Sequence, residues 1–167
     1  MAVHAVWHTG FSVRDLDRSI TFYTEGLGLE LVHRQKQDNP YTRALVGYPD
    51  ASLRIAQLRI PDVEPPPSGH ILELIEYVQP RGETIEVQHN RITSGHLAFE
   101  VDDIDERADR MVRYGAELVS EPVQITAGIN KGGKALYLHD PDGVTLELLQ
   151  PRRRSRGAAA EDEEETR

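Results

Sequence analysis

The chain of 167 residues contains no cysteine. This absence excludes disulfide bonds, zinc sites built on thiolates and catalysis by a cysteine nucleophile. The chain also lacks an apolar run near the roughly 18 residues that a membrane-spanning helix needs, and its first residues do not form the basic and apolar segments of a signal peptide. We therefore expect a cytoplasmic protein with no membrane partner.

Positive charge is scarce as well, since 28 acidic residues face 19 lysines and arginines, for a net charge of -9. An acidic surface repels phosphate backbones, so we expect no nucleic-acid partner. The C-terminal segment, residues 152–167, places a block of arginines before a block of acidic residues. Such charge blocks with few large apolar groups cannot bury enough surface to fold, which predicts a disordered charged tail.

What the sequence does contain is a long internal repeat. The segment HTGFSVRDLD, which begins at His8, returns as HLAFEVDDID from His96, an offset of 88 residues (96 minus 8). His, Phe, Val and two Asp residues recur at matching places. One long, fixed offset indicates a duplicated structural unit rather than a short-period solenoid.

The two units are too short to be stable alone, because domains of about 70 to 80 residues bury a small share of their surface. We therefore predict one domain over residues 1–151, built from a first module at about 4–80 and a second at about 92–151. Each module is predicted to follow the order β-α-β-β-β, which gives an α+β fold.

Alternation and turn residues predict the individual elements. In the first module the predicted strands are 5–13, 30–34, 42–46, 53–59 and 69–77, with a helix that starts after Asp15 or Asp17 and ends near Gly26 and Gly28. In the second module the predicted elements are a strand from His96, a helix over 104–114, and strands at 117–121, 125–126, 134–139 and 144–149.

The alternating pattern also divides each strand into two faces. His8 and His96 fall on the face that carries small residues, so we expect open space in front of both. Glu73 and Glu147 each fall on the face opposite a pair of leucines. A lone carboxylate within an apolar strand is costly unless it is paired or bound to a metal ion.

Two histidines and two glutamates at matching places therefore predict one divalent metal ion, bound by His8, Glu73, His96 and Glu147. These ligands suit Zn, Ni, Co, Mn or Fe(II). A six-coordinate ion would keep two open positions, where a small substrate with adjacent oxygens can chelate. Whether the four ligands come from one chain or from both chains of a dimer stays open.

Other polar residues are expected to have structural roles. The acidic pairs Asp15/Asp17 and Asp103/Asp105 precede the predicted helices, where capping explains them. Glu76 lies on the opposite strand face from Glu73. The histidines without a repeat partner are expected not to be ligands: His4, His33, His70, His89 and His139.

With these segments together, the chain resembles the vicinal oxygen chelate superfamily, which includes glyoxalase I, methylmalonyl-CoA epimerase, fosfomycin and bleomycin resistance proteins and extradiol dioxygenases. The matching segments are HT at 8–9, DLDRS at 15–19, FY at 22–23, GLGL at 26–29, GHLA at 95–98, DPDG at 140–143 and LEL at 146–148. The resemblance implies a cupped, partly open mixed β-barrel around one metal ion, with the same four ligands. We also expect a homodimer.

Resemblance to glyoxalase I implies a metal-dependent lyase or isomerase that moves a proton through an enediolate, with Glu147 as the base and Glu73 as its partner. Bacterial glyoxalase I enzymes hold glutathione with an arginine and an asparagine. Here those positions are Ser12 and Tyr77, so the two glutathione contacts are missing. Further candidates for substrate contact are Tyr77, Arg43, Asn130 and Lys131, together with Asn39 and Tyr41.

Two alternatives remain. An Fe(II)-dependent ring-cleavage dioxygenase is disfavoured by the fourth ligand, because oxygen activation needs more open positions on the metal. A non-catalytic, drug-binding resistance protein would keep the fold, but such proteins often lose the metal ligands, and all four are present here.

Overall fold

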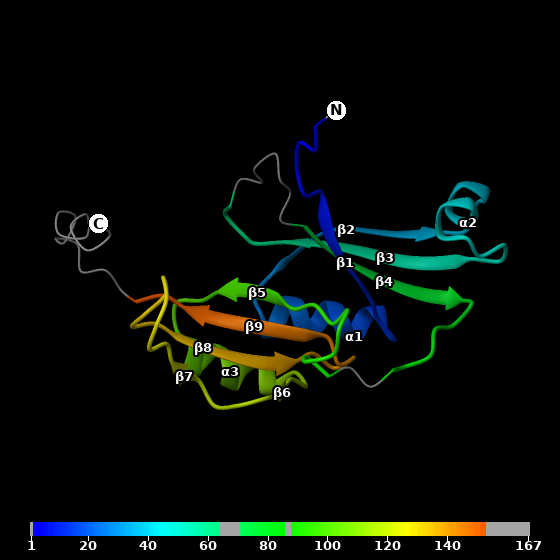
Figure 1. Cartoon of the computed structure of the whole chain (residues 1–167). Coiled ribbons are helices and arrows are strands. Elements are labelled where there is room, and N and C mark those ends of the chain that lie inside the picture. Colours follow the sequence, from blue (N-terminus) through cyan, green and yellow to red (C-terminus); the bar gives the residue numbers. More distant parts are fainter. Residues whose placement is uncertain (1, 64–70, 86–87, 153–167) are drawn as a thin grey trace.

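The structure, a computed structural model, describes residues 2–63, 71–85 and 88–152. Two modules follow one another along the chain, each with one mixed sheet (Figure 1). The elements of the first module are β1 (His8–Ser12), α1 (Leu16–Thr21), the π-helix η1 (Phe22–Gly26), β2 (Glu30–Gln37), α2 (Pro40–Val46), β3 (Ser52–Arg59) and β4 (Ile71–Gln79). Those of the second are β5 (Leu97–Glu100), α3 (Ile104–Arg113), β6 (Glu117–Leu118), β7 (Val123–Gln124), β8 (Lys134–His139) and β9 (Thr145–Gln150).

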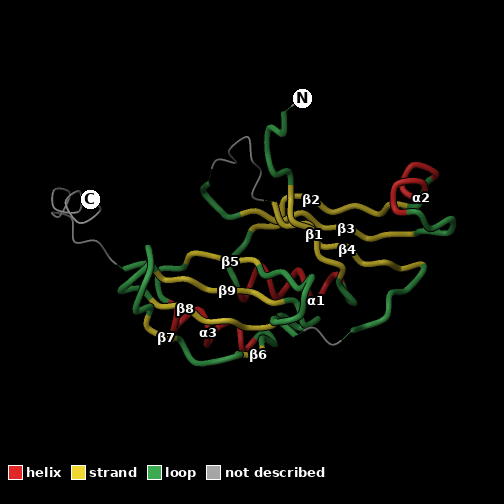
Figure 2. The backbone as a smooth tube through the Cα atoms, in the orientation of Figure 1, coloured by secondary structure: helices red, strands yellow, loops and turns green. Residues whose placement is uncertain are grey.

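The two sheets have the same topology. The first has the strand order β1-β4-β3-β2 and the second β5-β9-β8-β6, with β7 also paired to β8. In each, the first strand of the module runs parallel to the last one, and the other pairs are antiparallel. Figure 2 shows the two sheets as separate layers. The predicted α+β fold with two tandem modules is thus confirmed.

Aspartate caps start the main helix of each module. The side chain of Asp15 accepts hydrogen bonds from the backbone N–H groups of Asp17 and Arg18, and Asp103 accepts one from Glu106. These bonds satisfy donors that the first turn of a helix leaves free. Capping is therefore confirmed for Asp15 and Asp103, whereas the second aspartate of each repeated pair forms ion pairs: Asp17 with Arg34 and Arg54, and Asp105 with Lys134.

One hydrophobic core joins the modules. Helix α1 packs on β3 and β4, α3 packs on β6 and β9, and η1 contacts α3. The leucines on either side of each predicted glutamate ligand are buried in this core, so Glu73 and Glu147 face the other way. The core cluster draws on both modules and includes Leu16, Phe22, Tyr23, Leu58, Leu72, Leu74, Ile104, Met111, Leu138, Leu146 and Leu148.

The strand predicted at 42–46 is wrong, because this segment is helix α2. Asn39 caps it by accepting a hydrogen bond from the backbone of Thr42, and Pro40 occupies its first turn. Gly47 ends it with a φ of 75°, a left-handed conformation that glycine adopts without strain. Alternation over five residues was a weaker signal than these start and stop residues.

Smaller differences concern strand ends. The strand predicted at 125–126 is β7, two residues earlier, and β6 keeps only the first two residues of its predicted range. Trp7 falls within the strand predicted at 5–13, but it precedes β1 and is 72% exposed. His70 and nearly all of the predicted tail (153–167) lie outside the described residues. No helix in the described part of the chain is long and apolar enough to span a membrane.

Candidate functional site

His8 and Glu73 form the first pair of predicted ligands, on the face of the first sheet opposite α1. Strands β1 and β4 are parallel here, and Gly10 lies beside Glu73 in the register. A Cβ atom at Gly10 would lie 3.9 Å from Cδ2 of His8, an ordinary van der Waals contact, so this position suits a small residue. The Nε2 atom of His8 lies 3.6 Å from Oε2 of Glu73.

His96 and Glu147 repeat this arrangement in the second module. His96 directly precedes β5, and Ala98, another small residue, lies beside Glu147 on β9. The Nε2 atom of His96 lies 3.1 Å from Oε2 of Glu147. The same two atoms meet in both modules, so the repeat extends from the sequence to the side-chain geometry.

The structure brings the four predicted ligands together as two pairs, not as one cluster. Within residues 2–63, 71–85 and 88–152, no three His, Asp or Glu side chains lie close enough to share a metal ion. Both imidazoles are open to solvent, with 37% of the His8 side chain and 47% of the His96 side chain exposed. Each pair therefore supplies half of the predicted ligand set.

Two residues that we did not select from the sequence lie beside the glutamates. Gln57 on β3 is opposite Glu73 and donates a hydrogen bond from Nε2 to Oε1 at 3.0 Å. Tyr137 on β8 is opposite Glu147, and its hydroxyl lies 3.5 Å from Nε2 of His96. Burial raises the pKa of Tyr137, and the charge of Glu147 adds to this effect.

These two positions were predictable in part. Both Gln57 and Tyr137 lie in strands that the alternating pattern located, and both fall on the glutamate face. Their importance depends on the cross-strand register, however, which sequence periodicity does not give. Glu76, which we excluded as a ligand, is buried on the helix side, where it pairs with Arg54 and accepts a hydrogen bond from Leu16.

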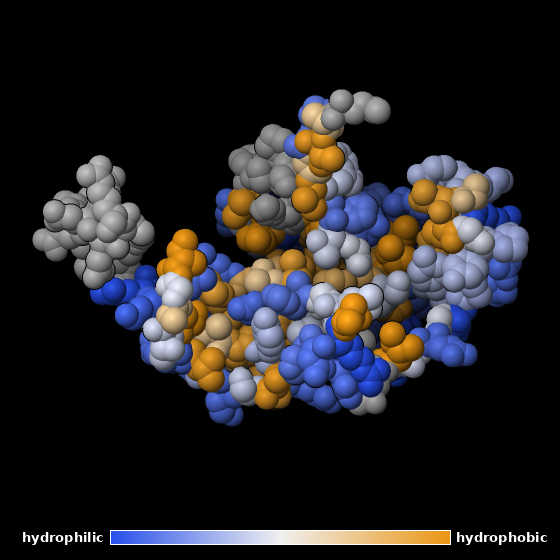
Figure 3. Space-filling view, in the orientation of Figure 1, coloured by the Kyte–Doolittle hydropathy of each residue, from blue (hydrophilic) through white to orange (hydrophobic). Residues whose placement is uncertain are grey.

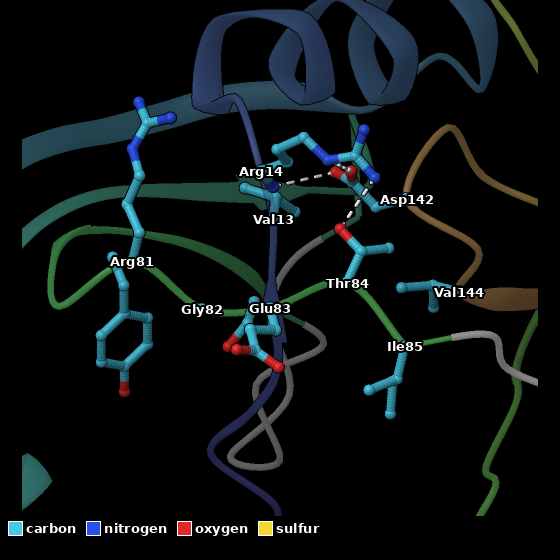
Figure 4. Close-up of a pocket in the computed structure, with 11 residues that line it drawn as sticks. Val13, Arg14, Arg81, Gly82, Glu83, Thr84, Ile85, Asp142 and Val144 are labelled. Atoms are coloured by element: carbon cyan, nitrogen blue, oxygen red, sulfur yellow. Dashed lines mark hydrogen bonds and ion pairs between the residues drawn. The ribbon is translucent and has the colours of Figure 1, made fainter.

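A pocket of about 490 Å³ lies at the far end of the first pair's sheet face. Ser12 and Tyr77 line it, four residues beyond His8 and Glu73 on the same strands. Figure 4 shows Arg14 bound to Asp142 and Thr84 at this pocket. Figure 3 shows hydrophobic and hydrophilic side chains side by side where this face of the molecule is hollowed between the two sheets.

The other predicted substrate residues are not gathered at either pair. Arg43 belongs to α2 and forms an ion pair with Asp38. Asn130 and Lys131 lie in an exposed turn, where the backbone N–H of Lys131 donates to Gly128 at 3.1 Å. Among the described residues, no contact joins Arg43, Asn130 or Lys131 to a His–Glu pair, so their roles remain predictions.

The turn at 140–143 joins the modules near the pocket. Asp142 pairs with Arg18 of α1, and the Tyr23 hydroxyl donates to Oδ2 of Asp140 at 2.9 Å. Burial raises the pKa of Asp140 and raises that of Tyr23 well above its usual value. The sequence predicted strands on both sides of this turn, at 134–139 and 144–149, but it did not indicate that the turn contacts the first module.

The sequence and the fold of this chain are similar to those of known proteins. Residues 5–148 match the Glyoxalase/Bleomycin resistance protein/Dioxygenase superfamily. A 2-epi-5-epi-valiolone epimerase from an Actinomyces species is 35% identical over 150 residues, which cover 87% of this chain and 78% of that protein. A probable lactoylglutathione lyase from Vibrio parahaemolyticus is 33% identical over 156 residues, or 91% and 94% of the two chains. The crystal structure of a glyoxalase family protein from Bacillus cereus matches with a TM-score of 0.78 and 25% identity, covering 91% and 97%.

Proposed function

Because the chain belongs to the glyoxalase/bleomycin resistance protein/dioxygenase superfamily, we propose that it is a divalent-metal-dependent isomerase or epimerase that acts next to a carbonyl group. The observation that carries this proposal is the His–Glu pair found in both modules, with Nε2 facing Oε2 each time. Relatives named as an epimerase and as lactoylglutathione lyases support a reaction of this class.

The residues present fit a divalent metal ion. Two ligand atoms bound at right angles to one ion, each at about 2.1 Å, lie about 3 Å apart. The separations of 3.6 Å and 3.1 Å in the two pairs are near this value, so each pair fits two adjacent coordination positions. When bound, the ion would polarise a carbonyl oxygen and stabilise the negative charge that develops on it.

Each pair supplies two of the four ligands, and we propose that a second copy of the chain supplies the other two. Large apolar side chains precede both predicted histidine ligands in the sequence and are exposed: Trp7 is 72% exposed and Ile92 is 94% exposed. Burial of such groups favours association. A dimer with two-fold symmetry would join the first pair of each copy to the second pair of the other and form two identical centres.

In this proposal Glu147 acts as the base. It removes a proton from the carbon next to the carbonyl group, as a positioned carboxylate does in general base catalysis. Return of a proton to the opposite face of that carbon gives an epimer, and return to the neighbouring carbon gives an isomer. Glu73 lies in the other half of the proposed centre, as the partner of Glu147 across the metal ion.

The pocket supports a small hydroxylated substrate rather than a glutathione adduct. Ser12 and Tyr77 lie about 13 Å along the strands from His8 and Glu73, by the usual rise of about 3.3 Å per residue. Both offer hydroxyl groups to the distal part of a substrate. The charged side chains of the lining balance one another: Arg14 and Arg81 against Glu83 and Asp142. This lining gives no excess of positive charge to attract the two carboxylates of glutathione.

Hydrogen exchange tests both the activity and the substrate class. The protein, loaded separately with Zn, Ni, Co, Mn or Fe(II), is incubated in D₂O with 2-epi-5-epi-valiolone or with the adduct of glutathione and methylglyoxal. We expect metal-dependent deuterium incorporation next to the carbonyl group of the first compound. Incorporation into the glutathione adduct alone would assign the substrate class to the lactoylglutathione lyases, and none with either compound would contradict the proposal for this class of ketone.

Mixing two inactive variants tests the shared centre. One variant lacks the first pair (His8→Ala with Glu73→Ala), and the other lacks the second (His96→Ala with Glu147→Ala). A mixed dimer with shared centres contains one intact centre, so co-expression should restore about a quarter of the exchange activity. No recovery in a proven mixed dimer would place each centre within a single chain.

A further inference from the structure

The two glutamates of the predicted centre differ in how they are held. Both oxygens of Glu73 have a neighbour: Oε1 accepts the amide hydrogen bond of Gln57 at 3.0 Å, and Oε2 faces His8. Within the described residues, no amide or hydroxyl group donates a hydrogen bond to Glu147, whose Oε2 lies 3.1 Å from Nε2 of His96. The cross-strand position that Gln57 occupies in the first module is filled by Tyr137 in the second.

This difference holds one carboxylate by a side chain other than its histidine, whereas the nearest polar contact given for the other carboxylate is its histidine, 3.1 Å away. A hydrogen bond from a neutral amide to a carboxylate is a strong, directional contact that fixes the orientation of the acceptor. Strand pairing holds the donor in place, because Gln57 and Glu73 are direct cross-strand neighbours. The oxygen that remains available on Glu73 is Oε2, the one that already faces His8.

We propose that Gln57 is a positioning residue that fixes Glu73 as a metal ligand, and that Tyr137 leaves Glu147 mobile enough to move a proton. The inference rests on the proposed metal centre. Hydrogen bonds of this kind orient metal ligands, and their loss typically weakens metal binding about 10- to 100-fold. Gln57 does not touch the substrate in this scheme, so its loss should lower metal affinity rather than turnover at saturating metal.

The test measures Co(II) binding to the full-length protein by titration and by the visible absorption of the bound ion. Gln57→Met has nearly the same side-chain length but no hydrogen-bond donor. We expect it to weaken Co(II) binding about 10- to 100-fold and to change the absorption spectrum. The matched control is Gln79→Met, which removes an amide hydrogen bond to Asp50 (2.8 Å) on the surface and should leave Co(II) binding unchanged.

A second variant keeps the test informative if the first variant folds poorly. Gln57→Asn keeps a polar amide but is one methylene group shorter, so the amide should no longer reach Glu73 and Co(II) binding should also weaken. Saturating Co(II) should restore the exchange rate of Gln57→Met, as expected for a residue that acts through a ligand. If the wild-type protein binds no divalent metal, the proposed function itself fails. If it binds Co(II) and both Gln57 variants bind equally well, only the role of Gln57 is overturned.

Discussion

The two modules share the side of the sheet that faces the helices and differ on the side that faces the predicted metal centre. On the helix side, Leu72 and Leu74 of β4 correspond to Leu146 and Leu148 of β9, and all four are buried. These residues meet in one core, where a change of volume is costly. Packing in this shared core therefore explains why the helix-facing sides of both modules have leucines at matching positions.

On the other side, the His–Glu pair and one further glutamate, Glu30 in the first module and Glu117 in the second, are the same, but their cross-strand neighbours differ. Gln57 stands where the second module has Tyr137. Two residues further along β3, Arg59 forms an ion pair with Glu30 across the strands, with a separation of 2.8 Å. In the second module, the matching cross-strand positions are occupied by His139 and Glu117. The duplicated fold has thus kept its ligand pair twice and given each copy different neighbours.

The modules also differ in the connection that follows the second strand. The first module has the helix α2 and long strands, with eight residues in both β2 and β3. The second has the two-residue strands β6 and β7. Tyr48, which follows α2, packs edge-on against Tyr77 at the pocket, with ring centroids 6.1 Å apart. The first module therefore builds more of the pocket wall than the second.

The largest expected effect distinguishes the proposed roles of Glu147 and Glu73. Glu147→Gln removes the proposed base without changing side-chain shape, so deuterium exchange at saturating metal should fall about 10²- to 10⁴-fold. Glu73→Gln should act mainly on metal affinity, because Glu73 is proposed as the fixed ligand. Exchange rates at increasing metal concentration, with circular dichroism to check folding, measure both effects. Unchanged exchange in Glu147→Gln would remove this residue as the base.

The next prediction tests whether the helix-facing sides of the two sheets contribute equally to the free energy of unfolding. Leu74→Ala and Leu148→Ala each open a cavity at a fully buried position beside a predicted glutamate ligand. Each should lower the free energy of unfolding by about 2–5 kcal/mol. Because one core cluster joins the modules, we expect a single urea transition in both variants. Two separate transitions in either variant would show that the modules unfold independently.

Most of the features that the two modules share could be predicted from the sequence, because they depend on local residue patterns. Strand alternation located the faces of Glu73 and Glu147, and the aspartates before each helix act as caps at Asp15 and Asp103. The prediction that the four ligands form one centre depends instead on how the modules or copies are arranged. No periodicity encodes that arrangement, and the structure has the ligands as two pairs.

Three features were not predicted, and only the first of them is marked in the local sequence. Helix α2 was misread because five alternating residues fit a strand, while Asn39 and Gly47 set the helix ends. The roles of Gln57 and Tyr137 follow from strand register, which is fixed by pairing across more than local sequence. The contact between Tyr23 and Asp140 joins residues 117 positions apart, too far for any local motif to indicate.

The smallest expected effect concerns the charged pairs that flank the helices. Asp17 pairs with Arg34 and Arg54 in the first module, whereas the corresponding Asp105 pairs with Lys134 alone, at 2.6 Å. The hydrogen bond from Arg54 is the main cause that holds the pKa of Asp17 below its usual value of 3.8, and the bond from Arg34 adds to it. The ionised carboxylate is therefore favoured in the folded protein.

A carboxyl group with a depressed pKa in the folded state stabilises the protein above its unfolded-state pKa, and this contribution is lost as the pH falls through the folded-state pKa. Asp17→Asn should thus lower stability at pH 7, and its difference from the wild-type protein should shrink as the pH falls through the folded-state pKa of Asp17. The side chain of Asp17 is 58% exposed, so solvent screening limits the effect at pH 7 to at most about 1 kcal/mol.

Urea midpoints at pH 7 and pH 2, in low and high salt, measure this loss of stability, with Asp105→Asn as the matched variant. Because two arginines act on Asp17 and one lysine on Asp105, the first variant should lose more stability at pH 7. An equal loss in both would mean that the second arginine contributes nothing and that the modules do not differ in this respect.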